Sequence, residues 1–123
     1  MEVVINGIVY VPKEKDKELE SVILKEHFKF EVHPKELGEM NWEDANTECA
    51  LLGEGWRLPT RGELVLMYEN KTVVGGFANN FYWSSTEYIT KGAWGQSFYN
   101  GGQLNFSKAN SIYVRAVRSL KNK

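Results

Sequence analysis

The segment GEGWRLPTRGEL, residues 53–64, is the feature that most restricts how this chain can fold. Thr60 and Glu63 have the spacing of a capping box, in which each side chain bonds the other residue's backbone amide at the start of a helix. Pro59 disfavours helical conformation at Leu58, so the chain must enter this helix in an extended form. We therefore expect an extended joint that leads directly into a capped helix.

Helical patterns lie on both sides of this joint. Asn41 is a candidate N-cap for the first helix, Glu43 and Asp44 suit its first turn, and Gly53 or Gly55 ends it. Its apolar stripe consists of Trp42, Ala45, Cys49 and Leu52, and the inner face of the second helix consists of Leu64, Met67 and Tyr68.

Strand patterns come before and after the two helices. In HFKFEVH (27–33), Phe28, Phe30 and Val32 alternate with polar residues, as in a half-buried strand. After residue 81 come FYWSST, AWGQSFY, GQLNFSK and IYVRAVRS, separated by turns such as Asn100-Gly101-Gly102. The order predicts an α+β fold of two helices plus a small antiparallel sheet.

The first residues predict a β-hairpin. In VVINGIVYV (3–11), Asn6-Gly7 fits a type I′ turn between two β-rich runs, which Pro12 ends. Because an isolated hairpin is marginally stable, we expect it to dock on the body of the protein or on a partner. The charged stretch 13–26 is expected to be a connector, with a short amphipathic helix that includes Leu19, Val22 and Ile23.

Length and charge exclude several classes of protein. A chain of 123 residues with 42% hydrophobic and 25% charged residues fits one soluble globular domain. The net charge of −1 argues against a nucleic-acid partner. No run approaches the roughly 18 apolar residues of a membrane span, and MEVVINGIVY lacks the pattern of a secretory signal peptide. We therefore expect no nucleic-acid and no membrane partner.

Few residues form a catalytic or metal-binding pattern. Cys49 lies on an apolar helix stripe, where a thiol usually belongs to the core. His27 and His33 would lie about 20 Å apart along a strand, too far for one ion, which leaves Glu31 and His33 as an incomplete site. The hydroxyls of SSTE (84–87) have no neighbouring histidine and are expected to bond the backbone. We expect no catalytic residue, no metal and no cofactor.

The arginines suggest structural roles. Arg57 lies between two apolar anchors, Trp56 and Leu58, and can clamp a ligand carboxylate, but an arginine in a joint more often ties loop carbonyls or an internal carboxylate. We expect that structural role. Odd spacing places Arg115 and Arg118 on opposite faces of a strand, and with Lys121 and Lys123 they predict a mildly basic end.

The best candidate for a binding surface lies in AWGQSFYNGGQLNFSK (93–108). If Trp94, Phe98, Leu104 and Phe106 fill the core, alternation displays their neighbours to solvent. Tyr, Ser and Asn are typical of adaptable binding surfaces, and an ordinary solvated strand face is the alternative. The candidate binding residues are Tyr88, Ser97, Tyr99, Asn100, Gln103 and Asn105.

Several of these segments together resemble a known family. LGEMNWEDA, GWRLPTRGEL, YWSSTE, AW…F…G and VRAVRS match, in order, the C-terminal domain family of bacterial collagen-like adhesins, over about residues 27–120. The resemblance implies a C-type-lectin-like fold in which the first and last strands pair, here 28–32 with 113–117. It also implies that binding uses the late strands and loops, roughly residues 82–110. Residues 1–26 would form a hairpin arm and connector outside this domain.

The resemblance also leads to an expectation about function. The family occurs in bacteria and phages, so we expect a non-enzymatic binding or assembly module, on a phage virion surface or fibre. The alternative is a calcium-independent carbohydrate- or protein-binding adhesin module of a bacterium, since the Glu-Pro-Asn and Trp-Asn-Asp motifs of calcium-dependent lectins do not occur here. The additional cysteines of the formylglycine-generating enzymes are also missing. Expected partners are a protein or a cell-surface glycan, with a possible homo-oligomer through residues 1–12. The expected location is the virion or the bacterial cytoplasm.

Overall fold

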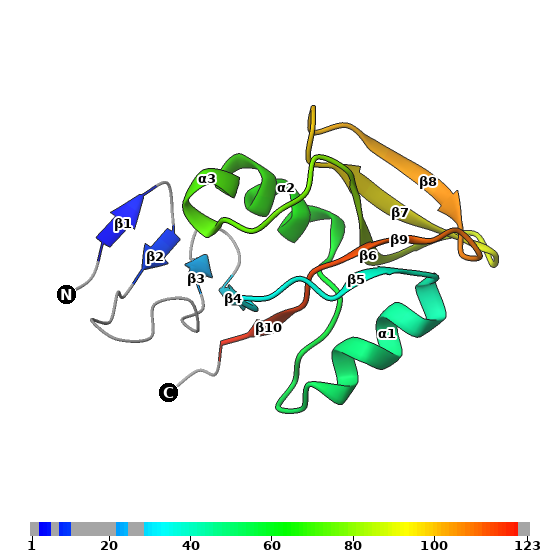
Figure 1. Cartoon of the computed structure of the whole chain (residues 1–123), viewed down its shortest axis with the longest axis horizontal. Helices are drawn as coiled ribbons and strands as arrows, with labels where there is room; N and C mark the ends of the chain where they lie inside the picture. The colour runs from blue at the N-terminus through cyan, green and yellow to red at the C-terminus, as the bar shows by residue number, and fades with distance from the viewer. Residues whose placement is uncertain (1–2, 6–7, 11–21, 25–28, 121–123) are drawn as a thin grey trace.

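The computed structural model describes residues 3–5, 8–10, 22–24 and 29–120. Two five-stranded sheets and three helices make up this part of the chain, which confirms the α+β class (Figure 1). The elements, in chain order, are β1 (Val3–Ile5), β2 (Ile8–Tyr10), β3 (Val22–Leu24), β4 (Phe30–Val32), β5 (Gly38–Met40), α1 (Trp42–Leu51), α2 (Arg61–Glu69), α3 (Lys71–Val74), β6 (Phe81–Tyr88), β7 (Gly92–Ser97), β8 (Gln103–Ser107), β9 (Ile112–Val114) and β10 (Val117–Ser119).

The first sheet has the order β1-β2-β3-β4-β10. The predicted hairpin is confirmed, because β1 and β2 pair antiparallel with Ile5 opposite Ile8. The amphipathic helix expected at Val22 and Ile23 is wrong, since these residues form β3 between β2 and β4. Their β-branched side chains favour a strand, and Leu19 and Pro12 lie outside the described residues. The hairpin thus docks on the body through β3.

The second sheet has the order β5-β9-β6-β7-β8 and is mixed rather than purely antiparallel. β6 and β9 run parallel, with Tyr82 opposite Tyr113. β5, which the sequence pattern did not reveal, pairs antiparallel with β9. Because β6 and β9 are not consecutive, their relative direction depends on how the chain returns through β7 and β8, which no local pattern encodes.

The final segment IYVRAVRS is two strands, not the single strand expected. β9 belongs to the second sheet and β10 to the first, with the break at Arg115 and Ala116. The first and last strands of the domain pair as the resemblance implied, but the partner of β4 is β10, with Val117 opposite Val32, rather than residues 113–117. Phe30 and Val32 are fully buried, as the alternation predicted, whereas His27 and Phe28 lie outside the described residues.

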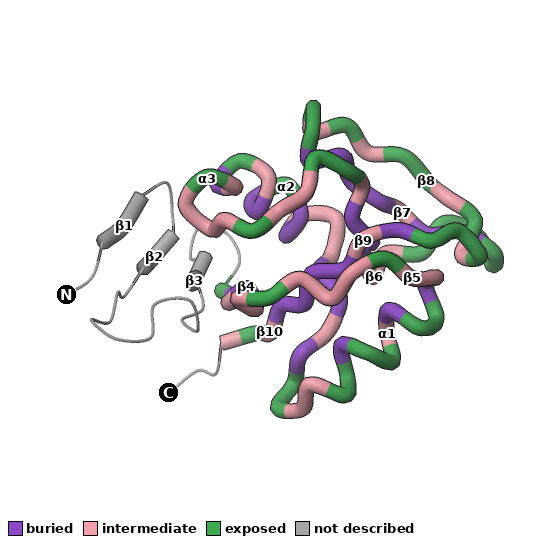
Figure 2. The backbone as a smooth tube through the Cα atoms, in the orientation of Figure 1, coloured by how far each residue is buried: buried purple, intermediate pink, exposed green. Residues whose placement is uncertain are grey.

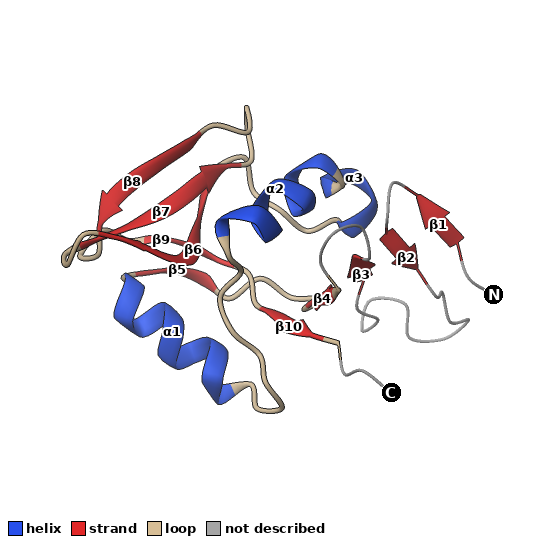
Figure 3. Ribbon diagram, turned by 180° about the vertical axis from the view of Figure 1, so that it is seen from behind, coloured by secondary structure: helices blue, strands red, loops and turns tan. Residues whose placement is uncertain are grey.

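The two long helices pack on opposite faces of the second sheet (Figures 1 and 3). Adjacent residues Tyr82 and Trp83 on β6 point to opposite faces, and both are completely buried. Tyr82 packs in the cluster of Leu64 and Met67 from α2, and Trp83 in the cluster of Cys49 from α1. Figure 2 shows the resulting buried layer between the helices. The two clusters explain why both helices carry an apolar stripe.

Helix α1 follows its sequence signals. The Asn41 side chain accepts a hydrogen bond from the Asp44 amide at 2.8 Å, which confirms the predicted N-cap. Leu52 caps the other end, and Gly53 adopts a φ of 79°, the left-handed conformation that commonly ends a helix. The stripe residues Trp42, Ala45 and Cys49 are buried.

Candidate recognition face

The joint before α2 is built around a bidentate ion pair. Arg57 donates from Nη1 and Nη2 to the two oxygens of Glu63, at 2.8 and 2.9 Å. Glu63 is only 5% exposed and also accepts from the Thr60 amide, which completes the predicted capping box. The bond to Glu63 raises the pKa of the Arg57 guanidinium. Arg57 therefore ties an internal carboxylate, as the sequence predicted.

The same joint connects the two sheets. The backbone of Arg57 exchanges two hydrogen bonds of 2.8 Å with Val117 on β10. The Pro59 carbonyl accepts from the Ser85 amide at 2.7 Å, and the Thr86 hydroxyl accepts from the Arg61 amide at 3.2 Å. Ser84 bonds the Thr86 backbone, as expected for these hydroxyls. The SSTE segment is the part of β6 where the register shifts, and the joint is hydrogen-bonded to it.

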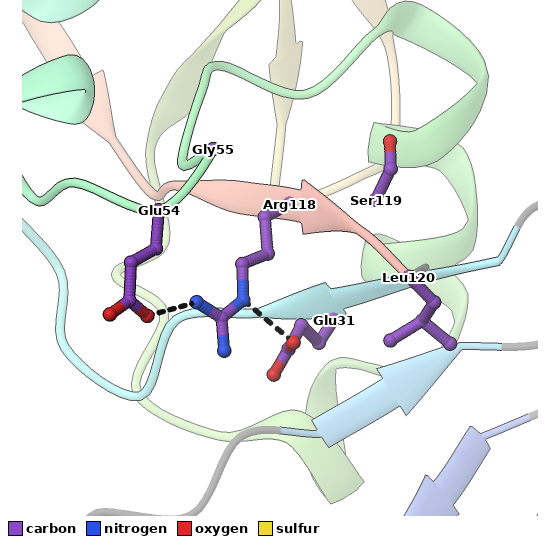
Figure 4. Close-up of a pocket in the computed structure, with 6 residues that line it drawn as sticks. All are labelled: Glu31, Glu54, Gly55, Arg118, Ser119 and Leu120. Atoms are coloured by element: carbon purple, nitrogen blue, oxygen red, sulfur yellow. Dashed lines mark hydrogen bonds and ion pairs between the residues drawn. The ribbon is translucent and has the colours of Figure 1, made fainter. Parts of the chain in front are cut away.

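A groove of about 820 Å³ lies beside β10, lined by Glu31, Glu54, Gly55, Arg118, Ser119 and Leu120. Arg118 reaches from β10 toward Glu31 on β4 and toward Glu54 in the loop between α1 and α2 (Figure 4). It donates to these carboxylates at 2.7 and 3.0 Å, and its guanidinium stacks on Trp56 at 4.5 Å. The charged groups that line the groove thus bond one another and are not free to bind a ligand. We therefore assign the groove a structural role.

Arg115 is buried rather than part of a basic end. It donates to the carbonyls of His33 at 2.6 Å and Gly75 at 2.9 Å, and it lies over the ring of Phe77. The expectation of a basic surface at this residue is wrong, because the strand is interrupted between β9 and β10 and the Arg115 side chain points into the interior. Lys121 and Lys123 lie outside the described residues.

The thiol and the imidazole considered as reactive groups are packed into the structure. Burial raises the pKa of Cys49 to about 12, so the thiol is protonated at neutral pH. The His33 ring packs edge-on against Trp56 at 4.7 Å and accepts from the Lys35 amide, and burial lowers its pKa. In the described part of the chain, no group of three or more potential ligands is placed to hold a metal ion.

Three of the candidate residues, the exposed Tyr88 and Asn105 and the half-buried Gln103, lie on the α2 side of the second sheet. Tyr88 is opposite Gly92, Asn105 is opposite Trp94, and Gln103 is opposite Gln96, so register places their side chains on one face. Tyr88, Gln103 and Asn105, three of the predicted binding residues, are therefore brought together by the fold.

Arg61 and Trp94 complete this surface, although the sequence analysis did not include them. The Arg61 guanidinium lies 3.7 Å above the Trp94 ring and donates from Nε to the Gln103 side chain at 2.8 Å. Tyr88 meets Trp94 edge-on with ring centroids 5.4 Å apart. We call Arg61, Tyr88, Trp94, Gln103 and Asn105 the recognition face. Arg61, Trp94, Gln103 and Tyr88 contact one another before any ligand binds, and Asn105 lies opposite Trp94 in the register.

The other expected placements differ in part. Ser97 is 4% exposed, and its hydroxyl accepts from the amides of Tyr99 and Asn100, so its predicted display is wrong. Tyr99 and Asn100 are exposed in the β7–β8 turn, about 20 Å along β7 from Tyr88.

Two core predictions also fail. Leu104 is 54% exposed because β8 is the last strand of its sheet, and Trp94 is half-buried under Arg61 rather than in the core. Phe98 is buried and Phe106 packs against the cluster around Trp83, as expected.

Comparison with known proteins agrees with the resemblance seen in the motifs. Among the described residues, no helix is both long enough and apolar enough to cross a bilayer. No curated protein matches the sequence. The sequence model of the Lcl C-terminal domain matches residues 15–118, and so begins earlier than the residue 27 expected from the motifs. The chain therefore belongs to the Lcl C-terminal domain family.

Proposed function

We propose that this domain is a non-enzymatic binding module that recognises its partner through the recognition face. The observation that carries the proposal is the pre-ordered cluster in which Arg61 stacks on Trp94 and bonds Gln103. Ordering such side chains before binding lowers the entropy lost on association. Aromatic rings and arginine are also the groups that most often anchor a protein interface.

Family membership supports a role on a surface. We place the domain on a phage virion surface or fibre, with a C-type-lectin-like body that presents the recognition face to a protein or glycan of the target cell. The hairpin of β1 and β2 provides the assembly contact with a neighbouring subunit of the virion, through residues 1–12. β1 is the last strand of its sheet, so one of its sides has no partner among the described strands.

A binding experiment on whole cells tests the recognition face. Fluorescent protein is titrated onto a panel of bacterial strains with a chelator present, and the same protein is applied to a glycan array. The double variant Tyr88→Ala with Asn105→Ala is expected to bind at least tenfold more weakly than wild type at an unchanged melting temperature. Both side chains are exposed, so their loss leaves the core intact.

A matched control lies on the other side of the sheet. Leu51 is 73% exposed at the end of α1, and Leu51→Ala is expected to bind as wild type does. Periodate treatment of the cells separates a glycan ligand from a protein ligand, because it oxidises sugar diols and leaves most proteins in place. Equal binding by the double variant and wild type, or no binding to any strain or glycan, would refute the proposal.

A further inference from the structure

Of the described sheet edges, those at β10 and β5 are closed, and β1 belongs to the hairpin discussed above. The β10 edge is occupied at Val117 by the backbone of Arg57. On the β5 edge, the Met40 carbonyl already accepts from the Trp83 indole at 2.9 Å, and the strand carries Glu39. β8 is the outermost strand of the second sheet in both views of the molecule (Figures 1 and 3). No described strand pairs with its outer side.

The register shows which backbone groups this edge presents. The Ser97 amide donates to the Gly102 carbonyl and the Lys108 amide donates to the Lys91 carbonyl. These bonds show that every second residue of β8, counted from Gly102, forms its backbone hydrogen bonds with β7. The backbone groups of Gln103, Asn105 and Ser107 therefore point away from β7. The Ser107 carbonyl accepts from the Asn110 amide, but a carbonyl oxygen has a second lone pair.

The usual protections of a sheet edge are missing from β8. Gln103–Ser107 has the sequence QLNFS, with no charged residue and no proline. The nearest charged residue along the chain, Lys108, is turned back toward the body, where its Nζ bonds the Thr90 carbonyl at 2.9 Å and lies over the Trp42 ring. Leu104 remains 54% exposed at this edge. An uncharged, unpaired strand of this kind is a template for another strand.

We infer that β8 is the contact between two copies of this chain, paired antiparallel about a two-fold axis at Asn105. In this register Asn105 faces its own copy, and Gln103 faces Ser107 of the second copy. The outward backbone groups then form about six hydrogen bonds, two for each facing pair. The two sheets become one continuous sheet, and the contact is isologous.

The side chains of β8 are complementary to themselves in this register. Leu104 of one copy faces Phe106 of the other at a non-hydrogen-bonded position, where cross-strand side chains approach most closely. Phe106 is half-buried against Phe81, so part of its ring is available to cover the exposed Leu104. On the opposite face, the two Asn105 amides meet and can bond each other. No like charges oppose one another, which is why a second copy fits better than a charged peptide.

The two-fold axis also determines where the recognition faces lie. Because the axis is perpendicular to the sheet, both copies present Tyr88, Trp94 and Asn105 on the same side. The dimer therefore offers two adjacent recognition faces to one cell surface. Simultaneous binding of both faces would raise the overall affinity without any new contact. The dimer itself rests on the β8 edge and not on the identity of the ligand.

A pair of substitutions at Asn105 tests the contact. Asn105→Pro removes the outward-pointing amide N–H at the axis and leaves the ladder with β7 intact, whereas Asn105→Ala keeps that N–H. Molar mass is measured by size-exclusion chromatography with light scattering over a wide range of concentration. Wild type and Asn105→Ala are expected to approach twice the chain mass of 14.1 kDa as concentration rises. Asn105→Pro is expected to raise the dimer dissociation constant at least tenfold.

Two further variants test the register and provide a second test of the contact in case Asn105→Pro does not fold. Cys49, the single cysteine, is buried, so Asn105→Cys introduces one accessible thiol at the axis. It is expected to form a disulfide-linked dimer under mild oxidation, faster than Tyr99→Cys in the turn, because facing Cα atoms about 5.5 Å apart suit a disulfide. Leu104→Lys, at an exposed position, should weaken the dimer even if the proline variant fails to fold.

The inference is overturned if wild type stays monomeric throughout, if Asn105→Pro and Leu104→Lys leave the dissociation constant unchanged, or if Tyr99→Cys cross-links as fast as Asn105→Cys. These outcomes are independent of cell binding, so failure of the dimer and failure of the recognition face are distinguishable.

Discussion

Three arginines of this domain carry the same charge but satisfy it in different ways. Arg57 forms a bidentate pair with a buried carboxylate, Arg118 pairs with two more exposed carboxylates, and Arg115 donates to backbone carbonyls in the interior. The sequence predicted a structural role for Arg57, in which it ties loop carbonyls or an internal carboxylate, but it did not identify Glu63 as the partner. It does not predict the burial of Arg115, since that depends on how the chain crosses between sheets.

Loss of the Arg57 side chain should lower stability. Arg57→Met leaves the Glu63 carboxylate buried without its cation, and we expect the free energy of unfolding to fall by about 2 kcal/mol. Urea denaturation measures this loss. The control is Glu54→Gln, which removes one of the two carboxylate partners of Arg118, at a side chain 82% exposed, and should cost less than about 0.5 kcal/mol. Equal losses in the two variants would contradict the structural role of Arg57.

Stability should also fall in alkaline solution. Burial raises the pKa of the Cys49 thiol from 9.0 to about 12, and burial and the hydrogen bond with Glu36 raise the pKa of Tyr82. The folded protein therefore holds these protons more tightly than the unfolded chain does. Their contribution is complete below about pH 9 and is lost as the pH rises toward 12.

Urea denaturation at a series of pH values measures this effect. The free energy of unfolding is expected to decline above about pH 9, and Cys49→Ala should make that decline less steep because it removes one of the two groups. An identical slope for the variant and wild type would show that Cys49 makes no contribution.

At the scale of elements, local signals predicted local structure. The N-cap at Asn41, the capping box at Thr60 and the hairpin of β1 and β2 were correct, because each depends on residues close together in sequence. The division between β9 and β10 was not predicted, since it depends on pairing of β10 with a β4 that is distant in sequence. β3 was not predicted because the spacing of Leu19, Val22 and Ile23 also fits a helix. The candidate site was limited for a different reason, because alternation gives the face on which a side chain lies but not its burial: Ser97 is buried, and Leu104 on the last strand is exposed.

The cap of α2 provides a test at this scale. The Thr60 hydroxyl accepts from the Glu63 amide at 3.2 Å, so Thr60→Ala should lower the free energy of unfolding by about 1 kcal/mol. The matched control is Thr47→Ala within α1, where the exposed hydroxyl bonds only the Glu43 carbonyl. Alanine favours the helix interior, so that variant should be neutral or slightly more stable. Thermal denaturation compares the two, and a larger loss at Thr47 would contradict the capping account.

At the scale of the whole molecule, the second sheet is buried on both faces near α1 and α2, whereas the recognition face and the β8 edge contain exposed residues. Tyr88, Trp94 and Asn105 come from three strands, so their meeting could not be predicted without the register. Strand alternation assigned Trp94 to the core, but a half-buried aromatic residue on the same face would give the same alternation. Arg61 gave no signal beyond its position inside the capping box.

Removal of residues 1–12 separates folding from assembly. β1 and β2 are the outermost strands of the first sheet, and the pairs β3–β4 and β4–β10 remain without them. We expect the shortened chain to keep a cooperative thermal transition and, in light scattering, to keep the dimer mass that the β8 contact gives. A shortened chain that no longer folds would contradict the division between hairpin and body.

The most direct measurement compares cell binding and stability in the same two variants. The joint of Arg57 and Glu63 is architectural in this account, and recognition belongs to Tyr88, Trp94 and their neighbours. Arg57→Met should therefore lower the melting temperature and bind cells like wild type at a temperature where it is folded. Tyr88→Ala with Asn105→Ala should melt like wild type and lose binding. The opposite result, lost binding in a fully folded Arg57→Met and normal binding in the double variant, would place the site at the joint.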